Sequence, residues 1–145
     1  LYESKMEVYL KGCRQEGIEH VIFGDLFLED LRRYREERLS QIGMKGVFPL
    51  WKQDTTLLAQ KMIQEGFKAI LTCVDLKKLP KEFAGRTYDE KLLNDFPEGI
   101  DPCGENGEFH SFVYGGPIFK KEIPIQLGET VEREGFAFAD VLVRL

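Results

Sequence analysis

Amphipathic segments alternate with short apolar runs along the first third of the chain. Apolar side chains recur every three or four positions from Tyr2 to Cys13, which predicts a helix that ends near Gly17. The apolar run at 20–24 ends in Gly-Asp and predicts a buried strand. A charged segment over 28–41 predicts a second helix. This helix–strand–helix order is typical of half of a parallel α/β layer.

Strand patterns dominate the later part of the chain. Asp54 is a suitable N-cap for a helix, and a second buried strand is predicted over 67–74. Thr87 and Glu90 have the spacing of a capping box, which predicts a helix over 87–94. A small, mostly antiparallel sheet follows, with predicted strands at 109–114, 118–127 and 136–143 and junctions near Gly128 and at Glu134-Gly135.

Together these patterns predict an α/β protein of two domains. Residues 1–47 form an incomplete parallel layer, and residues 48–145 a smaller α+β domain, with Phe48-Pro49-Leu50-Trp51 at the crossing. We expect the strands at 20–24 and 67–74 to be buried. We also expect the first layer to expose apolar surface, because one strand with two helices cannot close it. Since the chain begins with Leu1, within a helical pattern, we expect it to be a fragment of a longer protein.

Composition excludes several classes of protein. The 145 residues are 43% hydrophobic, enough for a packed core, and 25 acidic against 20 basic residues give a net charge of −5. That balance argues against a nucleic-acid partner. No apolar run approaches the roughly 20 residues of a membrane span. Three cysteines, odd in number and far apart, argue against disulfides and favour the cytoplasm. The sequence leaves homo-oligomer formation open.

Candidate chemistry concentrates in residues 92–119, which hold five acids and five glycines but no Lys or Arg. Glycines let backbone amides approach an anion, and carboxylates suit Mg²⁺, an ammonium ion or general-base catalysis. Glu108 and His110, two apart in an expected strand, would form an acid–imidazole pair on one face. One alternative is a plain hairpin around Asn106-Gly107. Another is a zinc site on Cys103 and His110, which lacks a second pair of ligands.

The first domain offers a second candidate region. Gly24-Asp25 follows the expected strand, at the edge where α/β folds bind ligands, although Asp25 is equally suited to capping the next helix. The arginines of the 28–41 helix suit phosphate binding, but a solvated face paired with the helix's own glutamates is the simpler interpretation: Arg32, Arg33, Arg35 and Arg38.

Three segments resemble, in the same order along the chain, motifs of the diphthine–ammonia ligase family in its bacterial form. They are residues 24–38, Phe48-Pro49-Leu50-Trp51, and Asp101-Pro-Cys-Gly-Glu-Asn-Gly-Glu-Phe-His-Ser-Phe-Val-Tyr114. The resemblance covers essentially the whole chain. It implies a Rossmann-like layer of the N-type ATP pyrophosphatases, also described as adenine-nucleotide α-hydrolase-like proteins, followed by a smaller substrate domain.

The resemblance also implies a reaction. ATP, with Mg²⁺, activates a carboxylate as an acyl-adenylate, and ammonia then displaces AMP to form an amide. The family's known acceptor is diphthine, a modified histidine of translation elongation factor 2. The implied roles are catalysis by Glu105, Glu108 and His110, acceptor binding by Asp101, Gly104, Asn106, Gly107 and Ser111, and nucleotide binding by Gly24, Asp25 and Arg35.

The sequence departs from the family's pattern at two points. The N-terminal pyrophosphate loop, Ser-Gly-Gly-Lys-Asp-Ser, does not occur in it, so we expect this chain alone not to adenylate a substrate. His110 stands where other branches usually carry an acid, and Ser111 replaces a commoner Thr while keeping the hydroxyl group. The alternative function is a nucleotide- or metabolite-binding module without catalytic activity.

Overall fold

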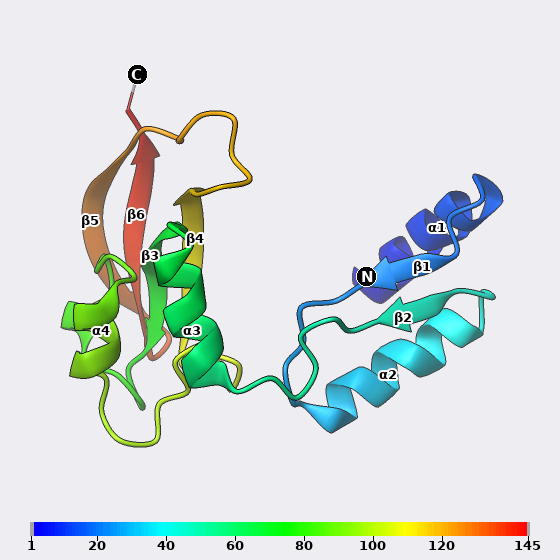
Figure 1. Ribbon diagram of the computed structural model, residues 1–145, viewed down its shortest axis with the longest axis horizontal. Coiled ribbons are helices and arrows are strands. Elements are labelled where there is room, and N and C mark those ends of the chain that lie inside the picture. Colours follow the sequence, from blue (N-terminus) through cyan, green and yellow to red (C-terminus); the bar gives the residue numbers. More distant parts are fainter. Residues whose placement is uncertain (1, 145) are drawn as a thin grey trace. The chain divides into compact units, whose positions relative to one another are not determined.

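A computed structural model describes residues 2–144, which divide after Gln53 into two compact units (Figure 1). The first unit contains, in chain order, α1 (Tyr2–Gln15), β1 (His20–Ile22), α2 (Glu29–Ser40) and β2 (Lys45–Val47). The expected helix–strand–helix order is confirmed. Strand β2 was not predicted, because three residues centred on a glycine carry no periodic signal. It pairs with β1 in parallel, from His20 opposite Lys45 to Ile22 opposite Val47.

Strand β1 is not buried, contrary to expectation. Val21 is half-buried and the side chain of Ile22 is 72% exposed. A strand with a single three-residue neighbour gains too little cover to bury both of its faces. Helix α1 is also open, with Val8 73% and Tyr9 68% exposed. The expected exposure of apolar surface in this unit is therefore confirmed.

The segment Phe48-Pro49-Leu50-Trp51 belongs to the first unit. The ring of Phe48 stacks on Phe23 with centroids 5.3 Å apart. The guanidinium of Arg32 lies 4.6 Å from the Phe48 ring centroid and 4.7 Å from that of Trp51. Because of these contacts the first unit extends to Gln53, so the boundary between the two units lies there rather than after residue 47.

The second unit is built on a four-stranded sheet. Its elements are α3 (Thr55–Gln64), β3 (Lys68–Asp75), η1 (Lys81–Phe83), α4 (Glu90–Asp95), β4 (Phe109–Gly115), β5 (Ile125–Arg133) and β6 (Phe136–Val143). The strand order is β4-β3-β6-β5, and every neighbouring pair is antiparallel, as expected. Across residues 2–144, none of the helices has the length and apolar character needed to cross a bilayer.

The core of the second unit gathers around β3, whose burial is confirmed. It consists of Leu71, Val74, Leu79, Phe83, Leu92, Phe109 and Ala137. The Phe96 ring stacks between two of these side chains, with its centroid 5.7 Å from that of Phe83 and 5.4 Å from that of Phe109. Because Phe109 also opens β4, the loop that precedes it is anchored directly on the core.

Two predicted boundaries are wrong. Residues 118–124 are not a strand; β5 begins at Ile125, directly after Pro124, which has no N–H to donate to a ladder. The strand then runs through Gly128, where a Cβ would come within 2.9 Å of the Asp140 Cβ, so glycine lets β5 lie close to β6. The predicted junction at Glu134-Gly135 is confirmed, with positive φ angles of 51° and 82°.

The capping residue of α4 is Asp89, not Thr87. The Asp89 side chain accepts a hydrogen bond from the Leu92 amide at 2.8 Å, whereas Thr87 pairs with Ile70 of β3 in an isolated bridge. The cap of α3 is predicted correctly, since the Asp54 side chain accepts from the Leu57 amide at 2.9 Å.

We therefore expect Asp89→Ala to lower the free energy of unfolding by about 1 kcal/mol, the usual value of an N-cap hydrogen bond. Thr87→Ala is the matched control, because its hydroxyl caps nothing, and we expect it to cost less than half as much. Urea denaturation followed by circular dichroism measures both. Equal losses in the two variants would contradict the assignment of the cap.

Candidate functional site

Residues 101–108, called the acidic loop below, form two successive tight turns before β4. The Gly104 amide donates to the Asp101 carbonyl at 2.9 Å, and the Gly107 amide donates to the Gly104 carbonyl at 3.0 Å. Gly104 and Gly107 have φ angles of +71° and +76°. A Cβ at Gly104 would lie 3.0 Å from the Phe109 carbonyl oxygen, so that turn requires glycine. No strand precedes the loop between Asp95 and Phe109, and the hairpin interpretation is wrong.

Two of the loop's three acids are buried and hold its shape. Glu108 is 2% exposed and Asp101 is 9% exposed. Oε1 of Glu108 accepts hydrogen bonds from the Asp101 amide at 3.2 Å and from Nδ2 of Asn106 at 3.1 Å. Oδ2 of Asp101 accepts from the Glu105 amide at 2.8 Å. The other oxygen of Glu108, Oε2, is buried and has no hydrogen-bond partner among residues 2–144.

Four contacts tie the loop to the rest of the second unit. The Tyr88 hydroxyl donates to the Pro102 carbonyl at 2.5 Å, and Nζ of Lys78 donates to the Asn106 carbonyl at 2.7 Å. The Cys103 thiol donates to the Thr55 carbonyl at 3.3 Å, and the Asp75 amide donates to the Glu108 carbonyl at 2.9 Å. No local pattern predicts the roles of Tyr88 and Lys78, because both reach the loop from other segments of the chain.

Burial keeps two groups neutral, the thiol of Cys103 in the loop and the hydroxyl of Tyr88 beside it. It raises the pKa of the Cys103 thiol to about 12, and the Asp101 and Glu105 carboxylates add to the shift. Burial likewise raises the pKa of Tyr88, with smaller contributions from Cys103 and Asp101. A thiol with so high a pKa is a poor metal ligand. Within the described part of the chain, no three side chains of His, Cys, Asp or Glu gather as a metal site, so the zinc alternative finds no ligand set there.

His110 and Ser111 do not face the interior of the loop. Glu108 precedes the first residue of β4, so the alternation of side chains along a strand does not apply to it, and its carboxylate turns into the loop. His110 is exposed and, with Ser111, lines a groove of the sheet. The expected pairing of Glu108 with His110 is therefore wrong.

In the first unit, Asp25 and Arg35 form an ion pair. Nε of Arg35 lies 2.7 Å from Oδ2 of Asp25, Nη2 donates to Oδ1 at 3.2 Å, and the guanidinium stacks 4.4 Å from the Phe23 ring centroid. Asp25 does not cap α2, whose N-cap is Leu28. Gly24, beside this pair, is exposed.

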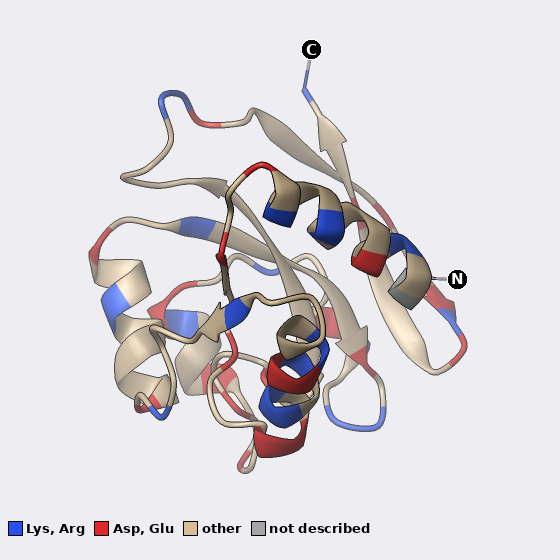
Figure 2. Ribbon diagram, turned by 90° about the vertical axis from the view of Figure 1, so that its right-hand side faces the viewer, with Lys and Arg blue, Asp and Glu red and all other residues tan. Residues whose placement is uncertain are grey.

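The other charges of α2 interleave along its ribbon (Figure 2) and pair mostly within the helix. Arg32 bonds Glu36 at 2.9 Å and Arg33 bonds Asp30. These contacts favour the structural interpretation of Arg32 and Arg33 over phosphate binding.

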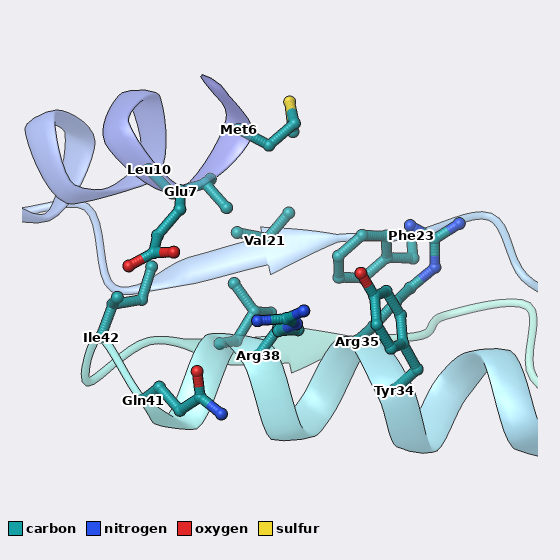
Figure 3. A pocket seen from close by; sticks show the side chains of 11 residues that line it. Met6, Glu7, Leu10, Val21, Phe23, Tyr34, Arg35, Arg38, Gln41 and Ile42 are labelled. Atoms are coloured by element: carbon teal, nitrogen blue, oxygen red, sulfur yellow. The ribbon is translucent and has the colours of Figure 1, made fainter. Parts of the chain in front are cut away.

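Arg35 also lines a cavity of about 140 Å³ in the first unit (Figure 3). Its wall is mainly apolar, with contributions from Leu10 of α1, Val21 of β1 and Leu39 of α2. Arg35 and Arg38 add guanidinium groups to the lining. The cavity is too small for a whole nucleotide, and the contacts of Arg35 with Asp25 and Phe23 already fix one of its two cations.

Comparison with known proteins places this geometry in a family. Residues 54–142 match the model of the diphthamide synthase C-terminal domain. A diphthine–ammonia ligase of Danio rerio is 35% identical over 139 residues, covering 91% of this chain and 54% of the relative. The ligase of Homo sapiens is 30% identical over 133 residues, covering 88% of this chain and 49% of the relative. The chain thus spans about half the length of these relatives.

The family match coincides with the second unit and includes the whole acidic loop. That unit is a diphthamide synthase C-terminal domain. The chain belongs to the diphthine–ammonia ligase family, as its three motifs indicated.

We expect Glu108→Ala to lower the free energy of unfolding of the second unit by about 2–4 kcal/mol, because it leaves the Asp101 amide buried without an acceptor. Glu108→Gln keeps an acceptor oxygen and should lose less than half as much. Hydrogen exchange of the Asp101 amide separates the two variants: protection should disappear in the first and persist in the second. A fully protected Asp101 amide in Glu108→Ala would contradict the proposed bond.

The raised pKa of Cys103 predicts slow alkylation. With a pKa of about 12, about one molecule in ten thousand carries the thiolate at pH 8, and the rate should still rise tenfold per pH unit between pH 9 and 11. In the urea-denatured chain the same thiol should level off near pH 9. Glu105→Gln removes one charge that raises this pKa and should speed the reaction. Peptide mapping by mass spectrometry after iodoacetamide treatment measures both effects, and a plateau near pH 9 in the folded chain would contradict them.

Proposed function

We propose that the protein acts in an ATP-dependent amide ligase of the diphthine–ammonia ligase type, with residues 54–144 as its substrate domain. In this reaction a carboxylate and ATP give an acyl-adenylate and pyrophosphate, and ammonia displaces AMP to form the amide. Membership of the family supports the ligase assignment. The observation that carries the site assignment is the acidic loop, whose shape is held by the buried Glu108 carboxylate.

The structure supports different roles for the loop's two glutamates. Glu108, buried and bonded to the Asp101 amide, is a positioning residue. Glu105 is half-buried, and its amide is fixed by the Asp101 carboxylate at 2.8 Å. In the proposal the Glu105 carboxylate orients an ammonium ion and takes a proton from it, which releases ammonia for attack on the acyl carbon. Asn106, Gly104 and Gly107 shape the loop, and His110 and Ser111 contact the acceptor.

The proposal assigns the nucleotide to the first unit, as an incomplete Rossmann-like layer, near Gly24, Asp25 and Arg35. The ion pair with Asp25, which includes one hydrogen bond from Nη2, fixes the Arg35 guanidinium, and this is a suitable arrangement for presenting its remaining N–H groups to an anion. The sequence lacks the family's pyrophosphate loop, and among residues 2–144 no three side chains of His, Cys, Asp or Glu gather as a metal site. We therefore assign no step to residues of this chain that depends on Mg²⁺.

Glu105→Gln tests the proposal, measured as ATP-dependent incorporation of ¹⁵N-ammonium into a candidate carboxylate together with AMP release. The protein is expressed from its whole reading frame. Loss of a charge that acts in the transition state should lower turnover about 10²–10³-fold, equivalent to about 2.7–4 kcal/mol. Its melting temperature should stay close to that of the wild type, because the group is only half-buried.

Glu98→Gln is the matched control. Glu98 is an exposed acid of the same cation-free segment, and its loss should leave turnover unchanged. Wild-type turnover in Glu105→Gln would remove this residue from the mechanism. Binding of a nucleotide or metabolite with no AMP release from the wild-type protein would contradict the ligase proposal and favour a binding module.

A further inference from the structure

The four-stranded sheet of the second unit carries a groove of about 560 Å³, called the sheet groove below. The register pairs Cys73 of β3 with both His110 of β4 and Phe138 of β6, so these three side chains share one face of the sheet. The residues one position along each strand are buried in the core on the other face: Phe109, Val74 and Ala137. The sheet groove therefore lies on the face that the core does not use.

One cation in the sheet groove stands out. The guanidinium of Arg133 stacks 4.5 Å from the Phe138 ring centroid, and no carboxylate of residues 2–144 forms an ion pair with it. Arg86 of the same unit, in contrast, pairs with Asp95 at 2.6 Å. The ring of Phe138 orients this guanidinium in the wall of the groove, and no carboxylate of the described residues neutralises it. Such a group can bind a planar anion.

The groove has a mixed lining, in which the apolar side chains of Ile123, Ile125 and Phe138 stand beside polar groups such as Thr72 and His110. Among the apolar lining residues, Phe112 is 37% exposed and Leu142 is 46% exposed. Clusters of exposed apolar side chains commonly mark binding surfaces. Asp140 also lines the groove, which disfavours a polyphosphate because of like-charge repulsion. The lining therefore suits a single carboxylate carried on an apolar or aromatic chain.

The acidic loop cannot bind a carboxylate itself, because Asp101, Glu105 and Glu108 would repel it. The register nevertheless places Arg133 close to the loop. Arg133 pairs with Phe136, Phe136 pairs with Asp75, and the Asp75 amide bonds the Glu108 carbonyl. Three inter-strand spacings separate the backbones of Arg133 and Glu108, or about 14 Å. An Arg side chain covers roughly half of that distance.

We propose that the sheet groove binds the acceptor through a carboxylate held by Arg133, with the ring of Phe138 beside the chain that carries it. This inference rests on the proposed function and names where that ligase recognises its substrate. The acidic loop then holds the cationic ammonium, and the sheet groove holds the anion. Arg133 is a specificity-determining residue in this arrangement.

The experiment is a titration of the uniformly ¹⁵N-labelled 145-residue chain with 3-phenylpropionate, followed by NMR, with the neutral amide 3-phenylpropionamide as the paired probe. We expect shifts at the backbone amides of Cys73, His110 and Phe138, and at least tenfold weaker binding of the amide. Arg133→Gln should weaken binding of the acid at least tenfold, and Arg133→Lys should restore part of the loss. Lys120→Gln, an exposed cation outside the groove, should change nothing. The spectra themselves show whether each variant is folded.

Equal affinity for acid and amide would overturn the inference, as would wild-type affinity in Arg133→Gln or shifts confined to the acidic loop or the first unit. The titration needs neither ATP nor turnover, so its outcome is independent of the ligase assay. Binding at the sheet groove without any amide formation would support the groove and contradict the proposed function. Amide formation by a protein whose sheet groove binds no carboxylate would support the proposed function and contradict the inference about the groove.

Discussion

The buried carboxylate of Glu108 is the interaction on which the candidate site depends. It bonds the amide of Asp101 at one end of the acidic loop and the side chain of Asn106 near the other. Burying a charge is costly unless hydrogen bonds compensate it, and here only one of the two oxygens is bonded. The core beneath, with Phe109 next in the chain, leaves the side chain no route to solvent. The packing around the acidic loop thus holds this carboxylate and the two turns in place.

Local signals predicted much of this architecture, and long-range pairing explains the failures. Asp54 caps its helix because the cap depends only on the next few residues. Thr87 has an equally good capping pattern, but it is taken up by a bridge to Ile70, which no local pattern reveals. The predicted face shared by Glu108 and His110 failed for a related reason. Strand β4 begins at Phe109, where pairing with Val74 starts, and the sequence alone does not locate that point.

The family motifs contain residues that the fold itself uses. In the first unit, motif residues largely bind one another: Asp25 pairs with Arg35, and Arg32 stacks on Phe48 and Trp51. In the acidic loop, Asp101 and Glu108 are likewise used to fix the backbone. A motif therefore marks residues that the fold needs as well as residues that meet a ligand. Burial separates the two groups, and burial is a property of the three-dimensional structure.

Electrostatic screening decides whether the loop and the sheet groove can work as separate charged sites. The Debye length is about 8 Å at physiological ionic strength, shorter than the roughly 14 Å between the backbones of Glu108 and Arg133. Because the Arg133 side chain can cover about half of that distance, screening weakens the field of the loop's acids at its guanidinium without removing it. In a ligase that must hold an ammonium ion and a carboxylate together, this separation matters. In a single mixed site the ammonium ion and the carboxylate would pair with each other. Two separate sites hold each reactant by its own charge, and the geometry of β3 and β6 then determines how the reactants approach each other.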